Sequence, residues 1–229
     1  MTILYGNIYQ TIGFACLTQA IFADTITRQI MSETYRLSFT FGGLLFPESV
    51  VIAQRYRELS DWEALKAETK QGVLLRKTRS SSRYRYFREI KDRLNQAWPF
   101  ELELIATEGT GARYAAFAMC CRYYRLVGDF VHEVVRDKVA MHEDCLSLSD
   151  YYHFLEMKAP LHPELARLSE TTRAKLRQVT FRMLTEGMLL EKAKEPRIRI
   201  PAVPEELVRQ YHEQGDSMAL EHLLYRSVS

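Results

Sequence analysis

The sequence lacks the short motifs that mark the common enzyme classes. It contains no phosphate-binding G-x-x-x-x-G-K-[S/T] loop, no G-x-G-x-x-G turn after a predicted strand, no H-E-x-x-H and no paired C-x-x-C motifs. A nuclease would need several carboxylates that converge on a metal ion, and the spacing of the acidic residues assembles no such group. We therefore predict a protein that is not an enzyme, has no catalytic residues and uses no cofactor.

Metal ligands are also scarce. The one cluster in the sequence is His-Glu-Asp-Cys at residues 142–145. His132 or His153 would have to complete a site with it, and no second ligand pair stands at a suitable spacing. The sequence therefore predicts no metal site.

Cysteine is rare, with four residues in a chain of 229, and the four show no framework spacing. Cys120 and Cys121 are adjacent, which suits no simple disulfide bridge. We expect free thiols, and hence a protein of the reducing cytoplasm.

Residues 3–23 are apolar but lack the features of a targeting segment. A signal peptide begins with a basic region, and no basic region precedes this stretch. A membrane helix would hold Asn7, Gln10 and Gln19 only at a cost. We interpret residues 1–34 as an N-terminal extension that packs or docks on the rest of the protein, and we expect no membrane association.

The chain has little net charge, because 31 basic and 29 acidic residues give only +2. The charges are unevenly arranged, however. Residues 76–94 hold eight basic and two acidic residues (+6), and residues 167–199 hold nine and four (+5). Between them, residues 99–166 hold six basic and eleven acidic residues (−5). Any affinity for nucleic acid must therefore come from the two basic blocks, because the whole molecule is not a polycation.

The fold class follows from the apolar pattern. Hydrophobic residues make up 47% of the chain, and they recur with the helical period over most of its length. We predict a mainly α protein with two helix-turn-helix-like units, in residues 35–98 and 99–229, although plain helical bundles share this order of elements. Leu189–Leu190 and the alternation over 197–200 predict two short strands, which would give the second unit a wing.

Capping residues set the expected limits of the first helices. Pro47 suits the first turn of one helix. Ser60 and Glu63 predict a capping box at the start of the next, and Gly72 predicts its left-handed end.

The later helices have similar signals. The serines at 80–82 can cap the first basic helix, and Ser169 the second. We further expect a central helix or helix pair over residues 112–140, with Gly128 as a kink or boundary, and a terminal helix over 205–225.

Helical projection predicts how the two basic helices are oriented. Their apolar stripes consist of Phe87, Ile90 and Leu94 in the first, and of Leu176, Val179 and Met183 in the second. The opposite stripes place polar residues at offsets 0, 4, 7 and 11: Ser81, Arg85, Arg88 and Asp92, and Thr171, Lys175, Gln178 and Arg182. Hydroxyl, amide and cationic side chains on an outward face are those that contact phosphates and base edges of DNA.

These stripes define the candidate DNA-binding residues. We expect Arg85, Arg88, Lys175 and Arg182 to contact phosphates or bases, and nearby cations to supply flanking charge. The complete predicted set is Arg79, Ser81, Arg83, Arg85, Arg88, Lys91, Thr171, Arg173, Lys175, Arg177, Gln178, Arg182, Arg197 and Arg199.

Other interpretations fit the same charges. A basic helix face can be an ordinary solvated surface, although solubility alone would intersperse both signs of charge. The faces could bind RNA. They could instead dock on acidic protein surfaces, which would make the chain a helical adaptor without direct DNA binding. This adaptor is the main alternative to duplex binding.

Four stretches together resemble the BrxA family of bacteriophage-exclusion (BREX) defence systems: YRLSFTFGGLLFPESVVIAQRY, SSSRYRYFREIKDRL, LHPELARLSETTRAKLRQVTFRML and GMLLE. The resemblance covers residues 35–191, and none of these stretches is a catalytic motif. It implies a small, helical, cytoplasmic protein with helix-turn-helix elements that binds double-stranded DNA. The implied partners are a DNA methyltransferase, a phosphatase-like protein and a large ATPase. We expect a monomer that supports host DNA methylation and phage exclusion.

Overall fold

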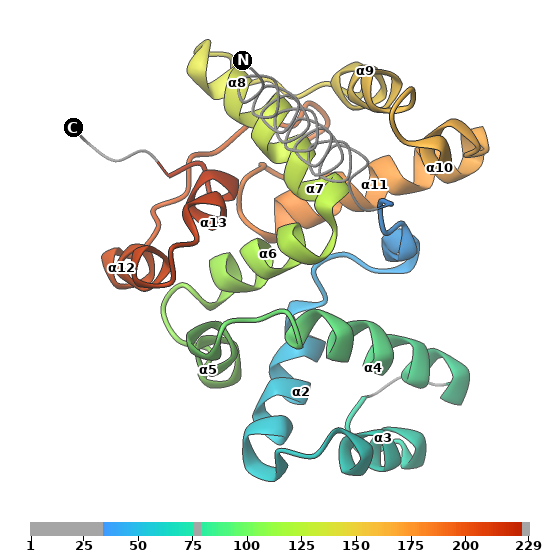
Figure 1. The fold of residues 1–229 in the computed structure, drawn as a ribbon, viewed down its shortest axis with the longest axis vertical. Helices are drawn as coiled ribbons and strands as arrows, with labels where there is room; N and C mark the ends of the chain where they lie inside the picture. Colours follow the sequence, from blue (N-terminus) through green and yellow to red (C-terminus); the bar gives the residue numbers. More distant parts are fainter. Residues whose placement is uncertain (1–33, 76–78, 226–229) are drawn as a thin grey trace, which may run out of the picture.

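The computed structural model describes residues 34–75 and 79–225, and over these residues the protein is mainly α-helical, as predicted. In Figure 1, α2, α3 and α4 form one end of the molecule, and α9 and α10 lie toward the opposite end. None of the helices in this part of the chain is long and apolar enough to cross a membrane. The predicted extension, residues 1–34, lies almost wholly outside the described residues, as does Cys16.

Most of the helices follow one another with short connections, but 18 residues separate α11 from α12. In chain order they are the 3₁₀ helix η1 (Ser38–Phe41), α2 (Phe46–Leu59), α3 (Trp62–Gln71), α4 (Ser80–Leu94), α5 (Pro99–Thr107), α6 (Ala112–Tyr123), α7 (Arg125–Phe130), the π-helical η2 (Val131–Val135), α8 (Arg136–Ala140), α9 (Leu148–Lys158), α10 (Pro163–Ala166), α11 (Glu170–Glu186), α12 (Glu205–Glu213) and α13 (Ser217–His222).

The first helices agree with most of the predicted caps. Pro47 lies in the first turn of α2, and Gly72 ends α3 with a left-handed φ of 84°. The predicted capping box at Ser60 is wrong. Because α2 continues to Leu59, Ser60 closes that helix with a φ of 52°, and Asp61 caps α3 by accepting from two N–H groups of its first turn.

The central helical region over 112–140 is broken before Gly128. Tyr124 leaves the helical conformation, with φ −109° and ψ 78°, and α7, η2 and α8 follow it. Gly128 instead lies inside α7, where a Cβ atom would stand 2.9 Å from Nε2 of His222. This glycine is therefore needed for close packing against α13 and is not the boundary.

The helix expected over 205–225 is two helices. Gly215 has a left-handed φ of 68° after α12, and the Asp216 carboxylate caps α13 by accepting from the N–H of Ala219 at 3.0 Å. A left-handed glycine followed by aspartate ends one helix and starts another, and this signal outweighs the helical period that continues across it.

The predicted wing contains no extended strand within the described residues. Isolated antiparallel bridges join Leu190 to Ile198 and Cys145 to Arg197. Pro196 has no N–H group to donate, which limits the ladder beside these bridges. The winged form of the second unit therefore stays a prediction.

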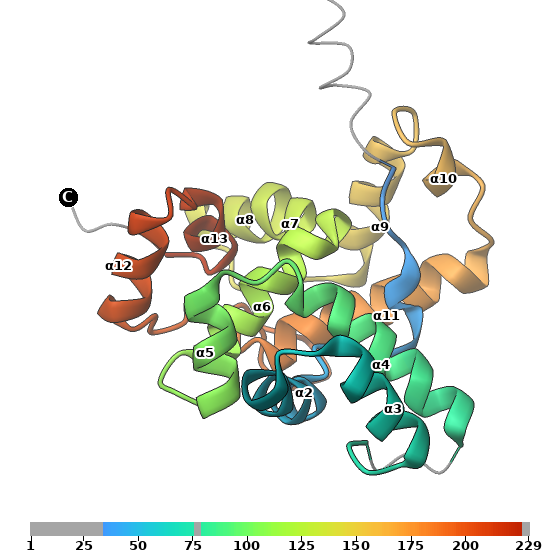
Figure 2. The same ribbon diagram turned by 60° about the horizontal axis from the view of Figure 1, so that its bottom comes forward.

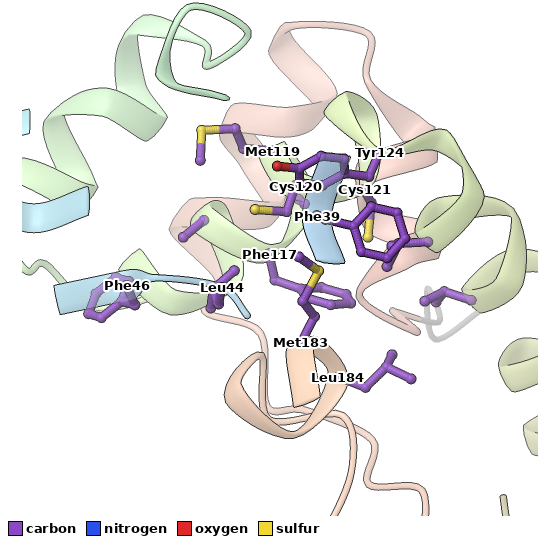
Figure 3. Packing of buried hydrophobic residues seen from close by; sticks show 14 of the residues in the cluster. Phe39, Leu44, Phe46, Phe117, Met119, Cys120, Cys121, Tyr124, Met183 and Leu184 are labelled. Carbon is purple, nitrogen blue, oxygen red and sulfur yellow. The ribbon is translucent and has the colours of Figure 1, made fainter. Parts of the chain in front are cut away.

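The core connects the segment before α2 with α6 and α11. Phe39 and Leu44 pack near Phe117 of α6 and Met183 of α11, and all four are almost completely buried (Figure 3). Burial of one such side chain stabilises the fold by about 1.5–3 kcal/mol. The buried apolar residues of the described chain form one cluster with members from both predicted units, and the domain division at residue 98 stays a prediction.

Candidate nucleic-acid interface

Helix α4 turns its predicted polar stripe to solvent. The exposed residues are Ser81, Arg85 and Arg88, with Asp92 half-buried at the end of the stripe. The buried residues are Phe87, Ile90 and Leu94. The predicted orientation is confirmed, because apolar side chains at three- and four-residue spacing fix the rotation of a helix about its axis. Two arginines therefore point outward from α4.

The start of α4 differs from the prediction. Arg79 occupies the N-cap position, and its side chain makes no capping hydrogen bond. Ser80, Ser81 and Ser82 lie inside the first turn instead of capping it. The first N–H groups of a helix carry partial positive charge, so the beginning of α4 favours an anionic ligand in addition to its arginines.

Helix α11 repeats the arrangement of α4. Its exposed residues are Thr171, Lys175, Gln178 and Arg182, and its buried stripe is Leu176, Val179 and Met183, as predicted. Ser169 caps the helix as expected, since its Oγ accepts from the N–H of Thr172 at 3.2 Å.

Two side chains of the α11 stripe are bound to neighbours on the helix. Lys175 Nζ donates to Gln178 Oε1 at 3.0 Å, and Arg182 Nε donates to Glu186 Oε1 at 2.7 Å. The carboxylate raises the pKa of Arg182 and offsets part of its charge. An exposed i,i+4 ion pair is worth only about 0.3–0.5 kcal/mol, so a phosphate can displace it. The α11 face is therefore less cationic than its sequence indicates.

Two flanking cations of α4 hold α3 in place. Arg83 donates to the carbonyl oxygens of Thr69 and Lys70, both at 3.3 Å, in the last turn of α3. The ammonium of Lys91 lies 5.7 Å from the ring centroid of Trp62. Both side chains lie at the α3–α4 junction and not on the outward stripe, so their first role is structural.

The flanking arginines of α11 have similar contacts. Arg173 donates to the carbonyl oxygen of Leu165 at 3.4 Å. Arg177 donates to the hydroxyl of Tyr152 at 3.0 Å, and its guanidinium lies 5.3 Å from the centroid of that ring. These contacts fix α10 and α9 against α11.

The segment after α11 carries one cation that is paired with a carboxylate and three further exposed cations. Arg197 and Arg199 are both exposed, and Arg197 forms an ion pair with Asp144 at 2.5 Å. Lys192 and Lys194 are also exposed, in the loop between Leu190 and Arg197. Helical projection does not identify these two lysines, because they lie outside the helices.

Arg93 belongs to the basic block of residues 76–94 but is completely buried. Its Nε donates to the hydroxyl of Tyr124 at 2.9 Å, and its Nη1 donates to the carbonyl oxygens of Gly43 at 3.1 Å and Leu44 at 2.9 Å. The Tyr124 hydroxyl in turn donates to the carboxylate of Glu89, which is also buried. One positive and one negative charge of the block are therefore structural.

The two basic helices lie on the same side of the molecule. In Figures 1 and 2, α4 and α11 both run from the right-hand edge toward the middle, so their N-terminal halves are peripheral and their C-terminal ends approach each other. A pocket of about 330 Å³ is lined by Tyr86 of α4 and by Arg182 and Glu186 of α11. The last stripe residue of α11, Arg182, thus shares a pocket with a residue of α4 that lies beside its stripe.

The His, Cys, Asp and Glu side chains of the described residues are not gathered into a metal site, and two of the three described thiols are buried. In residues 34–75 and 79–225, no group of three or more His, Cys, Asp or Glu side chains could hold a metal ion. Cys120, Cys121 and Cys145 are free thiols. Burial raises the pKa of the Cys120 and Cys121 thiols, the opposite of what an activated nucleophile requires.

The chain is similar to a known protein family and to a protein of known structure. The family model described as BrxA matches residues 33–215. No curated protein matches the chain. The fold is similar to the crystal structure of an uncharacterized protein from Magnetospirillum magneticum, with a TM-score of 0.70 and 24% sequence identity, over 83% of this chain and 98% of that one. This similarity concerns the fold alone.

Proposed function

Because the chain belongs to the BrxA family, we propose that it is a BREX-associated protein that binds double-stranded DNA and catalyses no reaction on it. The observation that carries this proposal is the pair of outward faces on α4 and α11. Each combines hydroxyl or amide groups with cations over three turns, and Asp92 is the one acidic residue in either predicted stripe.

Arg88 is the clearest contact residue of α4. It is exposed, and within the described residues it forms no ion pair with a carboxylate. On α11, Lys175 is bound to a neutral amide, so its charge is not offset. An arginine can bind two phosphate oxygens or the O6 and N7 of guanine, whereas a lysine acts as a point charge. In this proposal both helices contribute phosphate contacts, and Arg85, Arg88 and Gln178 are the residues suited to reading bases.

The BREX context supplies the proposed partners. Bound to duplex DNA as a cytoplasmic monomer, the protein would work beside the methyltransferase, the phosphatase-like protein and the ATPase of the system. Its helix-turn-helix units would hold the duplex, and host methylation and phage exclusion would depend on this binding.

A salt titration tests the proposed ligand. If about six phosphates are neutralised, the logarithm of the affinity for duplex DNA should fall against the logarithm of the salt concentration with a slope near −5. Fluorescence anisotropy with labelled duplex, single-stranded DNA and structured RNA gives the slope and the preference. Stronger binding of RNA than of duplex, or no duplex binding at low salt, would contradict the proposal.

The adaptor function has support from a different surface. Met141, Met157 and Leu161 lie in or beside α8–α10 and are each more than 60% exposed. Exposed apolar side chains of this kind suit a protein partner better than DNA. Met157→Lys with Leu161→Lys should reduce co-purification with the other BREX proteins and leave duplex affinity unchanged. Retention of the partners by this double variant would exclude α9 and the turn after it as the docking surface.

A further inference from the structure

Two pockets meet at the start of α6, and one of them reaches both basic helices. The two pockets, of about 280 and 330 Å³, share Phe46 and Arg113 as lining residues. The larger pocket is also lined by Tyr86 of α4 and Arg182 of α11. Arg113, in the first turn of α6, therefore lies in a pocket that residues of both basic helices also line.

The Arg113 side chain is held in place without being neutralised. Its guanidinium carbon lies 4.7 Å from the ring centroid of Phe46. Arg113 is exposed, and in the described parts of the chain it forms no ion pair. Stacking on an aromatic ring restricts the rotamers of an arginine and leaves its N–H groups available. By contrast, the neighbouring Arg182 is paired with Glu186.

The acidic residues that line the two pockets favour a phosphate of a bound duplex over a free anion. Glu48, Glu108 and Glu186 also line the two pockets. Glu186 is engaged, because it accepts from Arg182 and from the backbone N–H of Leu44 at 2.6 Å. A free anion would enter these pockets, where arginines and glutamates are mixed, with no other contact to hold it. A phosphate within a duplex that α4 and α11 already hold is brought to Arg113 at high effective concentration.

We infer that Arg113 binds a backbone phosphate of the duplex where the DNA passes from α4 to α11. The inference rests on the proposed function and adds a contact from a third helix, inside the segment that the sequence marks as acidic. It makes the two basic faces parts of one continuous interface. Charge counting misses Arg113, because its neighbours in the sequence are mainly apolar and the block from 99 to 166 is net negative.

Salt titration of two Arg113 variants tests this contact. In Arg113→Gln the slope of log affinity against log salt should become shallower by about 0.9, the value for one phosphate on duplex DNA. In Arg113→Lys the slope should remain that of the wild type, because the charge is retained. Arg209→Gln, on the exposed face of α12, is the matched control and should also keep the wild-type slope.

The possible results distinguish failure of the Arg113 contact from failure of the proposed function. A thermal unfolding curve for each variant shows whether loss of stacking on Phe46 alters the fold. If the wild type binds duplex and folded Arg113→Gln keeps its slope, Arg113 is not a phosphate contact, and the proposed function stands. If the wild type binds no duplex, the proposed function fails, and the Arg113 contact fails with it.

Discussion

Reversal of Arg85 and Arg88 to glutamate is expected to lower the affinity for duplex DNA by about 100-fold or more while the fold stays intact. An arginine that binds a base or phosphate contributes roughly 1–3 kcal/mol, and each 1.4 kcal/mol is about tenfold in affinity. Reversal also adds repulsion between glutamate and phosphate. Both side chains are exposed, so the core of α4 is not altered.

A matched control separates local contacts from total charge. Arg136→Glu with Arg209→Glu produces the same change in net charge on α8 and α12, which lie away from α4 in Figure 1. Binding of labelled duplex is measured for both double variants by gel shift, and folding by circular dichroism. If the control weakens binding as much as the α4 variant does, the effect comes from overall charge. Wild-type affinity in the α4 variant would remove α4 from the interface.

The orientation of both basic helices could be predicted from sequence because it depends on local geometry. Three apolar residues at helical spacing determine which side of α4 or α11 faces the core, whatever lies in that core. Arg88 and Lys175 can be identified as outward cations in the same way, without knowledge of any contact distant in the sequence.

Several properties of the site depend on distant contacts and could not be predicted. Arg93 is counted as a surface cation by any charge sum, but its acceptors at Gly43 and Leu44 are about 50 residues away. Arg113 lies near both basic helices because α6 contacts α4 and α11. The ion pair between Arg197 and Asp144 likewise cannot be predicted without the fold.

The prediction of helix limits was correct where a single residue can cap the helix. It was wrong where two neighbouring residues can both act as the cap. Ser169 has no rival and caps α11 as expected. Ser60 and Asp61 are both good caps, and the length of α2 assigns the role to Asp61. No turn-forming residue lies at the break at Tyr124. The sequence therefore favours Gly128 as the boundary.

Replacement of Arg93 by methionine is expected to destabilise the protein more than any substitution on the outward faces. The buried guanidinium binds the carbonyl groups of Gly43 and Leu44, and Glu186 of α11 accepts from the N–H of Leu44. This segment thus joins α4 to α11. A larger residue at Gly43 would displace the Glu186 carboxylate, because a Cβ atom there would lie 2.2 Å from Glu186 Oε2.

The expected cost of Arg93→Met is about 3–5 kcal/mol, because the substitution leaves the buried Glu89 carboxylate without a nearby cation and the carbonyl groups of Gly43 and Leu44 without their donor. For a chain of this size, each kcal/mol lowers the melting temperature by roughly 2–4 °C, so the total decrease is roughly 6–20 °C. Differential scanning calorimetry measures it. Arg209→Met, which removes an exposed arginine from α12, should change the melting temperature little. Equal stability of the two variants would contradict a structural role for Arg93.

A second substitution identifies the source of that cost. In Arg93→Met the Glu89 carboxylate stays buried beside the Tyr124 hydroxyl without its cation. Glu89→Gln removes this charge and keeps an oxygen that can accept from Tyr124. The double variant should therefore be more stable than Arg93→Met alone, although Glu89→Gln by itself destabilises, and the coupling in the double-mutant cycle should lie between about 0.5 and 3 kcal/mol. If the two losses simply add, Tyr124 does not couple these charges, and the cost of losing Arg93 comes from the unpaired carbonyl groups of Gly43 and Leu44.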